Sequence, residues 1–167
     1  ENGYDINMKD GYGGNALEWA AQENRISNAK MLIENGCEVN NLNSDGMTAL
    51  YTACAEGNAD MARLLLDNNA EPDRTEDATP LIIASCYGKI ECVKLLLEHG
   101  TDVNTIDNDG RTALFYAVVY GQGKVEKLLS DNGASYDICD KDGVSPGQLK
   151  DEGVRKRVYS ELMGEEE

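Results

Sequence analysis

Few residues in this chain could carry catalytic or metal chemistry. His99 is the only histidine, and there are five cysteines. An enzyme needs acid, base or nucleophile groups that converge, and a zinc site needs several Cys or His ligands at close spacing. The cysteines are odd in number and form no Cys-x-x-Cys pair, so we predict free thiols in a reducing compartment. They are Cys37, Cys54, Cys86, Cys92 and Cys139.

None of the remaining chemical candidates completes a site. The segment TIDNDG (105–110) partly matches a calcium loop, but Tyr116 stands where a bidentate Glu is needed. The segment GYGG (11–14) lacks the Gly-Lys-Ser/Thr of a phosphate loop. His99 precedes Gly100, where its positive form suits a helix C-terminus at the surface. We therefore predict no catalytic residue, no metal, no cofactor and no enzyme activity.

The charge of the chain excludes several kinds of ligand. Thirty-one acidic residues stand against fifteen basic ones, which gives a net charge of −16. Such a chain repels phosphate backbones and anionic lipid, so we expect no nucleic acid partner. No apolar run approaches the roughly 20 residues of a spanning helix, so we expect no membrane insertion. We expect an intracellular, cytoplasmic location, with the nucleus as the alternative.

A recurring segment decides between strand and helix. Taken alone, LFYAVVY (114–120) favours a buried strand, whereas Thr112 before it is typical of a helix cap. The segment DGRTALFYAVVYG (109–121) aligns with DGMTALYTACAEG (45–57) and EDATPLIIASCYG (76–88). Weaker copies begin before and after these three. The aligned positions Asn15, Thr48, Thr79, Thr112 and Ser145 are separated by steps of 33, 31, 33 and 33 residues, the period of helical solenoids.

Each copy continues with a second helical pattern. In DMARLLLDNN (60–69) and ECVKLLLEHG (91–100), apolar residues fall at helical intervals. Gly57, Gly88 and Gly121, with Asn24 at the same place, should end the first helix. The predicted unit is helix, tight turn, helix and a loop of about ten residues.

These units resemble the ankyrin repeat. The similarity lies in the DG-x-T-A/P-L openings, the LLL-x-x-G second helices, and the endings EVN (38–40) and DVN (102–104). It covers nearly the whole chain and implies an all-α solenoid of stacked helix-turn-helix units with hairpin loops. Within a single domain (1–167) we predict a tail of a preceding repeat (1–8), four repeats (9–42, 43–73, 74–106, 107–139), a degenerate C-terminal capping repeat (140–164) and an acidic tail (165–167).

The two ends of the chain carry further expectations. Asn7 lies 33 residues before Asn40, so NGYDIN (2–7) is interpreted as the end of an earlier unit. Because the chain also does not begin with Met, we expect it to be a fragment that at least one further helix pair once preceded. At the other end, Val154, Val158 and Leu162 should face inward and the basic residues outward.

Three departures from the family pattern are visible. The family usually has a His at the positions that Glu18, Tyr51, Ile82 and Phe115 occupy here. We therefore do not expect the hydrogen bonds by which that His joins neighbouring repeats. The loop AEPDRTEDA (70–78) is two residues short, which predicts a stunted hairpin. Glu126 and Ser130 replace apolar residues on a buried stripe, where an unpaired polar group costs about 1–3 kcal/mol. We expect the patch formed by Glu126 and Ser130 either to be open to water or to serve a function.

The resemblance implies a partner surface on the concave side, at the loop tips and the ends of the first helices. We expect Asp45, Glu76, Asp109 and Asp142 to form an evenly spaced acidic row that attracts basic segments. An apolar anchor should sit near Met47, Tyr87, Arg111 and Tyr120. The full predicted set is Tyr12, Glu23, Asp45, Met47, Glu56, Glu76, Tyr87, Asp109, Arg111, Val119, Tyr120 and Asp142.

Plainer interpretations stand beside this one. An Asp before a turn Gly also suits the turn itself. Trp19, Phe115 and Tyr116 favour packing over recognition. Asn40 and Asn104 resemble sites that asparaginyl hydroxylases modify in ankyrin proteins, although turn hydrogen bonds also account for them.

We therefore predict a non-catalytic module that binds a partner protein or peptide with basic residues and an apolar anchor. The alternative is a regulatory or targeting segment of a larger enzyme or channel, packed against its own chain.

Overall fold

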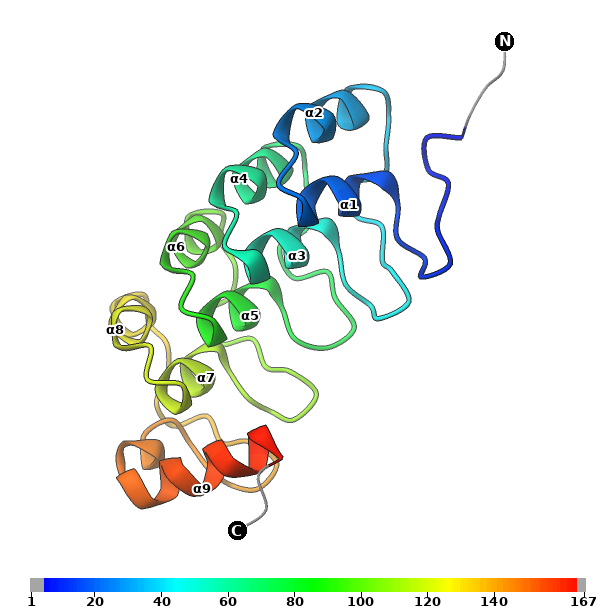
Figure 1. The fold of residues 1–167 in the computed structure, drawn as a ribbon. Coiled ribbons are helices and arrows are strands. Elements are labelled where there is room, and N and C mark those ends of the chain that lie inside the picture. Colours follow the sequence, from blue (N-terminus) through cyan, green and yellow to red (C-terminus); the bar gives the residue numbers. More distant parts are fainter. Residues whose placement is uncertain (1–4, 165–167) are drawn as a thin grey trace.

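Nine helices in the described part of the chain build a curved stack, and their local sequences set where each one begins (Figure 1). The computed structural model describes residues 5–164; the acidic tail at 165–167 and the first four residues of the predicted repeat tail lie outside this range. The inner helices are α1 (Ala16–Gln22), α3 (Ala49–Glu56), α5 (Pro80–Cys86) and α7 (Ala113–Val119). The outer ones are α2 (Ile26–Glu34), α4 (Ala59–Asp67), α6 (Ile90–Glu98) and α8 (Gly123–Asp131), and η1 (Gln148–Lys150) and α9 (Glu152–Met163) close the C-terminal end.

The segment that resembled a strand is helix α7. Thr112 Oγ1 accepts a hydrogen bond from the backbone N–H of Phe115, as expected for an N-cap. Asn15, Thr48 and Thr79 cap the other inner helices in the same way. Among the described residues the structure has no strand, only a single bridge between Ile106 and Thr112. The all-α solenoid is confirmed.

The inner helices end where the sequence predicted. Asn24, Gly57, Gly88 and Gly121 all adopt a positive φ, between 51° and 81°. This left-handed residue turns the chain back, so that an outer helix runs antiparallel to each inner one. The four predicted repeat ranges each contain one such pair, and the range 140–164 contains η1 and α9.

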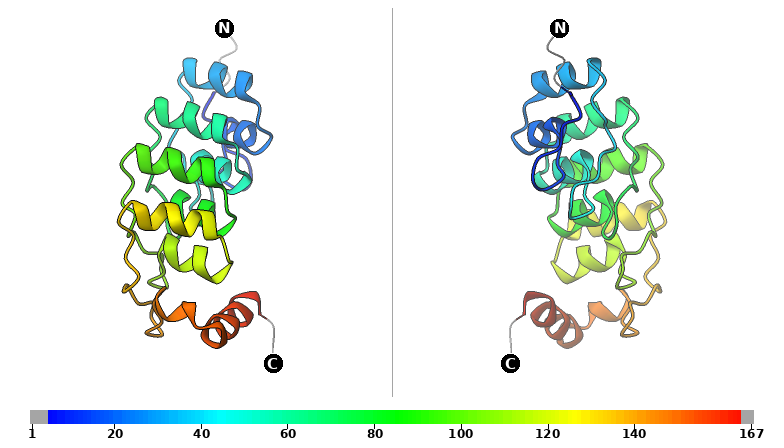
Figure 2. Two further views of the ribbon diagram at one scale, coloured as in Figure 1. Left: turned by 90° about the vertical axis from the view of Figure 1, so that its left-hand side faces the viewer. Right: turned by 90° about the vertical axis from the view of Figure 1, so that its right-hand side faces the viewer.

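Neighbouring pairs bury one another's apolar faces. Leu50, Leu81 and Leu114 of the inner helices are fully buried, as are Leu65 and Leu96 of the outer ones. Inner helices pack on inner helices and outer on outer along the stack. Figure 2 shows the outer helices one above another, with α9 at the end of the column.

Asparagine side chains join the end of one repeat to the next. Asn40 Oδ1 accepts from the Glu71 N–H at 2.8 Å, and Asn104 Oδ1 accepts from the Ser135 N–H at 2.8 Å. Asn7 repeats this bond with the Glu38 N–H. Asn40 and Asn104 thus have a structural role, but their side chains bond between repeats and not within the turn, as the turn interpretation expected.

The shortened loop lacks the usual closing bond. A backbone N–H···O bond spans four residues in the hairpins at Asp10–Gly14, Asn43–Met47, Asp107–Arg111 and Asp140–Val144. In the described loop 70–78, Thr75 Oγ1 instead donates to the Asp77 carbonyl. This confirms the stunted hairpin.

The polar pair on α8 and the C-terminal cap both find partners. Glu126 accepts a hydrogen bond from the Tyr136 hydroxyl at 2.9 Å, and the Ser130 hydroxyl donates to the Lys127 carbonyl. Neither group is left unpaired in the core. In α9, Val158 is buried, while Val154 and Leu162 pack against the core from its edge.

Removing one cap should measurably weaken the stack. We expect Thr112→Ala to lower the free energy of unfolding by about 1 kcal/mol, because the Phe115 N–H loses its acceptor. Thr112→Ser keeps the hydroxyl and should retain most of the stability. Urea denaturation of the three chains tests this, and equal losses for Ala and Ser would contradict a capping role.

Candidate partner-binding surface

Hydrogen bonds hold the loop tips side by side. The Ser44 N–H donates to the Tyr12 carbonyl at 2.8 Å, and the Glu76 N–H donates to the Gly46 carbonyl at 3.2 Å. Further along, the Lys141 N–H donates to the Asp109 carbonyl at 2.9 Å. The tips therefore form one continuous edge, on which Asp45, Glu76, Asp109 and Asp142 are all exposed.

The turns at these tips are stabilised by a different residue from the exposed acid. Asn43 Oδ1 accepts from the N–H groups of Asp45 and Met47. Asp140 Oδ1 likewise accepts from the N–H groups of Asp142 and Val144. Within residues 5–164, the carboxylates of Asp45 and Asp142 make no hydrogen bond. Their acidity is therefore not required to hold the turn.

Arg111 is already engaged within the chain. Its guanidinium pairs with Asp109 at 3.3 Å and with Asp140 at 3.5 Å, and lies 5.5 Å from the centre of the Phe115 ring. Its side chain is largely buried. Arg111 therefore lines the surface and links the tip that carries Asp109 to Asp140 of the next tip.

The predicted aromatic anchors separate into exposed and packed residues. Tyr87 is 57 % exposed at the end of α5. Tyr120 stacks on Tyr116 at 6.4 Å, and the edge of the Tyr159 ring from α9 meets it at 5.7 Å. Tyr120 is thus held largely by its own chain.

Val119 corrects one prediction. Its side chain is only 4 % exposed, because it points into the core between α7 and its neighbours. It therefore cannot contact a partner in this arrangement. The remaining predicted residues are exposed (Tyr12, Glu23, Asp45, Glu56, Glu76, Tyr87, Asp109, Asp142) or half-buried (Met47, Arg111, Tyr120).

A small niche lies between the second and third tips. Its volume is about 90 Å³, and Met47, Tyr51 and Ala78 line it together with the acids Asp45 and Asp77. Apolar and acidic groups thus meet at one place on the edge. Burial raises the pKa of Tyr51, and the nearby Tyr87, which is exposed, raises it further, so Tyr87 lies close to one wall of the niche.

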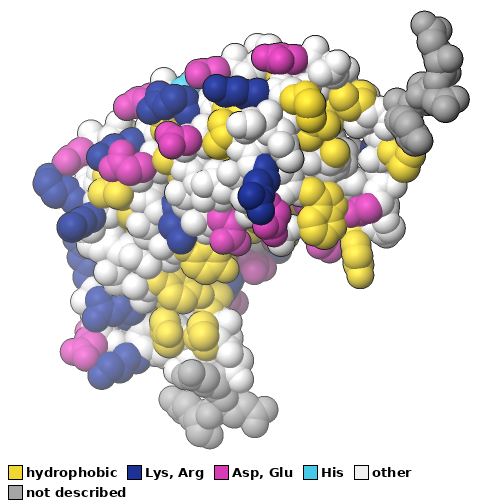
Figure 3. Space-filling model, turned by 45° about the horizontal axis from the view of Figure 1, so that its top comes forward, with side chains coloured by type: hydrophobic (Ala, Val, Ile, Leu, Met, Phe, Trp, Pro, Cys, Tyr) yellow, Lys and Arg dark blue, Asp and Glu magenta, His cyan; other side chains and the backbone are white. Residues whose placement is uncertain are grey.

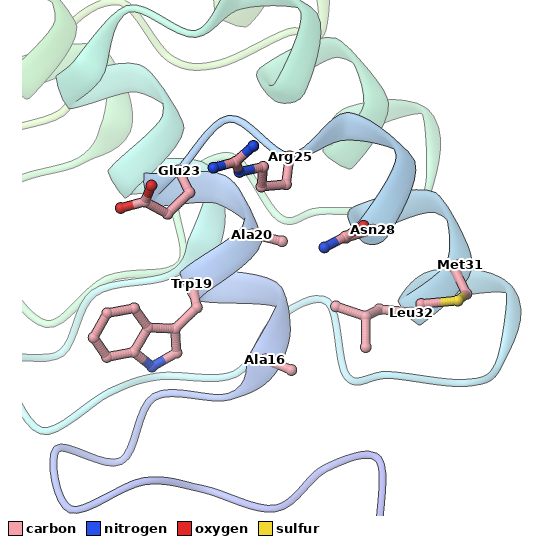
Figure 4. Close-up of a pocket in the computed structure, with 8 residues that line it drawn as sticks. All are labelled: Ala16, Trp19, Ala20, Glu23, Arg25, Asn28, Met31 and Leu32. Atoms are coloured by element: carbon pink, nitrogen blue, oxygen red, sulfur yellow. The ribbon is translucent and has the colours of Figure 1, made fainter.

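The N-terminal repeat carries a surface that the sequence did not assign. Trp19 was expected to pack, yet it is 52 % exposed, and its indole N–H donates to Asp10 at 2.8 Å. Beside it a hollow of about 340 Å³ opens between α1 and α2 (Figure 4). Figure 3 shows hydrophobic side chains gathered in two areas, one near this end and one towards the C-terminal end.

Glu18 replaces one of the missing histidine ties. Its Oε1 accepts a hydrogen bond from the Asn43 side chain at 2.6 Å, which links the first repeat to the next loop. Its Oε2 is buried without a hydrogen-bond partner in the described structure. Burial raises the pKa of Glu18, and the neighbouring Asp10 and Asp45 raise it further. The ionised form is thus disfavoured in the fold.

The groups that could do chemistry form no cluster beyond one pair of thiols: Cys54 and Cys92 share a hydrogen bond, which lowers the pKa of Cys92. Within residues 5–164 no three His, Cys, Asp or Glu side chains are placed to hold a metal ion. His99 is exposed, with Nδ1 2.8 Å from the Leu95 carbonyl. Burial raises the pKa of the Cys86 thiol to about 11, which disfavours the nucleophilic thiolate. No helix in this part of the chain is long and apolar enough to cross a membrane.

The thiols should react in the order of their exposure. Cys139 is exposed, whereas Cys37, Cys54 and Cys92 are buried. We expect a disulfide-forming aromatic reagent to label Cys139 quickly in the native protein and the buried thiols only after unfolding. A Cys139→Ser variant is the control, since its fast phase should vanish. Fast labelling of Cys54 or Cys92 would contradict a structural role.

Glu18→Gln should stabilise the protein at neutral pH. Because the folded state raises the pKa of Glu18, that state binds the proton more tightly, so the contribution of Glu18 to stability falls as pH rises through the raised value. Because the glutamine of the variant cannot ionise, the variant does not lose stability in this way as pH rises. Its advantage over the parent should be present at pH 7 and disappear as pH falls towards the ordinary glutamate value. Urea denaturation at both pH values tests this; an advantage independent of pH would contradict it.

Comparison with known proteins agrees with the geometry. The family described as ankyrin repeats (3 copies) matches residues 2–76 and 72–142. A curated protein, Ankyrin repeat and SOCS box protein 12 of Mus musculus, is 53 % identical over 34 residues, which cover 20 % of this chain and 11 % of that protein. The chain thus spans a small part of the length of that relative. With capped helix pairs at the predicted period and matches over most of its length, the chain belongs to the ankyrin-repeat family, whose repeats are generally non-catalytic protein-protein interaction modules.

Proposed function

We propose that the chain is a non-catalytic recognition module in the cytoplasm that binds a protein or peptide through its loop tips and concave face. The partner carries basic residues and one apolar anchor. One observation carries the proposal: exposed carboxylates on the tips adjoin an apolar niche and an exposed tyrosine.

The acidic tips supply attraction for the basic residues. Asp45, Glu76 and Asp142 are exposed, and turn hydrogen bonds do not use the carboxylates of Asp45 and Asp142. The net charge of −16 adds a long-range field of the same sign. Such a field speeds the encounter with a basic segment and makes binding dependent on salt.

The middle of the stack supplies the apolar contact. Met47 and Tyr51 line the niche of about 90 Å³, and Tyr87 offers an exposed ring on the next inner helix. Rigid aromatic rings commonly anchor interfaces. Since Tyr120 is packed and Val119 is buried, the anchor belongs at Met47, Tyr51 and Tyr87, closer to the N-terminus than the sequence indicated.

A second role has its own observation. The exposed apolar face beside Trp19 fits a module that also packs against another part of a larger polypeptide. In that role the repeats regulate or target an enzyme or channel. This role and partner binding at the tips use different surfaces and are compatible.

Selection from a display library of random peptides tests the proposal. We expect the parent chain to enrich peptides that combine Lys or Arg with an aromatic or large aliphatic residue. The triple variant Asp45→Asn, Glu76→Gln, Asp77→Asn should lose the basic preference, and Tyr87→Ala should weaken binding of selected peptides by roughly 1–2 kcal/mol. Binding should also weaken as salt rises.

A matched control removes charge elsewhere. Glu34, Asp60 and Glu98 are exposed acids on the outer helices. Changing all three to their amides lowers the net charge equally and should leave the selected peptides unchanged. An equal loss in both triple variants would mean that net charge alone, and not the tips, determines binding.

A further inference from the structure

We infer that the niche between the second and third loop tips is an arginine site, into which the partner inserts one guanidinium group. The inference rests on the proposed function and names the basic group that the partner supplies. The wall of the niche includes Asp45, Met47, Tyr51, Asp77 and Ala78, and its volume is about 90 Å³. Pockets for whole small molecules measure roughly 300–1,000 Å³, so this niche admits only the end of one side chain.

The chain itself shows how a guanidinium fits between two of its tips. Between the fourth and fifth tips, Arg111 Nη1 lies 3.3 Å from the carboxylate of Asp109 on its own tip. Its Nε lies 3.5 Å from Asp140 on the next tip. The guanidinium also lies 5.5 Å from the centre of the Phe115 ring. One arginine is thus held by an acid from each tip and by an aromatic ring.

The niche repeats this arrangement with a methionine at the position of the arginine. Met47 and Arg111 correspond, since each follows a turn Gly and precedes a capping Thr. The acid of the same tip and the aromatic ring recur at the same spacing. They are Asp45 for Asp109, and Tyr51 for Phe115. The second tip therefore has the acid and the ring, but its own chain supplies no guanidinium to them.

Asp77 supplies the acid from the next tip. It stands in the shortened loop where the neighbouring tips have the turn glycines Gly46 and Gly110. Its Oδ1 accepts from the Asn108 N–H at 2.9 Å, which fixes the carboxylate beside the niche. The pKa of Tyr51 is raised mainly by burial, and the charge of Asp77 adds to this effect, so Asp77 lies near the ring. Asp77 thus takes the part that Asp140 plays for Arg111.

This combination selects a guanidinium over an ammonium group. Arg111 reaches two carboxylates on different tips through two of its nitrogens. A planar guanidinium can do this while it packs on a ring, whereas the ammonium of lysine is a compact, strongly hydrated point charge. The apolar stem of the arginine would lie on Met47 and Tyr51. The separate apolar residue of the partner then lies beside the exposed ring of Tyr87.

The neighbouring gaps between tips lack this combination. Glu18 stands at the position of the ring in the first repeat, and the buried Ile82 stands there in the third. In the fourth repeat the ring is present, but Arg111 already occupies the place. Among the four repeats, the second therefore has the ring and both acids with no arginine of its own.

A titration with a blocked arginine tests the inference directly. The full chain is labelled with ¹³C at the methyl groups of its five methionines, and Met47→Leu identifies the Met47 signal. We expect N-acetyl-arginine methylamide to shift that signal in a saturable way. N-acetyl-lysine methylamide should shift it several-fold less, because an ammonium cannot bridge the two acids.

Two matched variants locate the site. Asp77→Asn removes one carboxylate but can keep an oxygen acceptor for the Asn108 N–H, and it should abolish the preference for arginine. Asp60→Asn makes the same change at an exposed site on the outer helix α4 and should leave the titration unchanged.

Peptides selected by display on the parent chain give a second measurement. Replacing their arginine by lysine should weaken binding roughly tenfold on the parent chain and much less on Asp77→Asn. An unchanged Met47 signal with blocked arginine, or equal responses to both blocked amino acids, would overturn the inference while the proposed function stood. If the selection enriched no peptide, the proposed function would fail, and the titration would still decide whether the niche binds arginine.

Discussion

The structure depends on the cover that each helix pair receives from its neighbours. Its inner and outer helices are 7 to 9 residues long, which is too short for stability in isolation. The missing stability comes from burial of leucine side chains. Leu50 and Leu81 are buried between inner helices, and Leu65 and Leu96 between outer ones. Because every pair has two apolar faces, such a stack always has two ends to be covered. Helix α9 covers one end, and in the described structure the hollow beside Trp19 lies between α1 and α2 of the first repeat.

The loop tips of the stacked repeats form a continuous surface. Backbone bonds link most successive tips, and the Asp77 carboxylate links the third tip to the fourth by accepting from the Asn108 N–H. Asparagines such as Asn40 and Asn104 fix the ends of the repeats. The turn positions at Asn43 and Asp140 satisfy the tip N–H groups, which frees the neighbouring acids to face solvent. The same geometry that builds the repeat thus produces an acidic edge. The short loop at 70–78 interrupts this pattern and brings Asp77 to the niche beside Met47.

The period alone made the fold predictable from the sequence. The structure confirms the caps at Thr48, Thr79 and Thr112 and the left-handed positions at Gly57 and Gly88, which follow from local chemistry. The exposure of individual side chains was harder to predict, because it depends on which elements pack against each face of a helix. Trp19 and Tyr116 occupy the same position in their repeats, and each donates a hydrogen bond to the aspartate of its own hairpin, Asp10 or Asp107. In the described structure only the repeat of Tyr116 packs against a preceding helix pair. The prediction for Val119 was wrong for the same reason, since its position in the helix did not reveal that neighbouring helices bury it. Tyr120 is half-buried, because the Tyr159 ring of α9 packs against it.

The C-terminal cap also decides which tyrosines are left for a partner. The ring of Tyr159 on α9 meets Tyr120, so sealing the stack withdraws that aromatic surface. The exposed Lys150, Lys156 and Arg157 meanwhile place positive charge around α9. All three are paired with acids, Lys150 with Glu126 of α8 and the other two within α9, but the cap is still less negative than the tips. The basic partner that we propose would therefore meet less attraction at α9 than at the middle of the edge, where Tyr87 remains exposed. Electrostatics and packing thus favour the same place on the stack, because the cap at its end carries nearly balanced charge and packs against Tyr120.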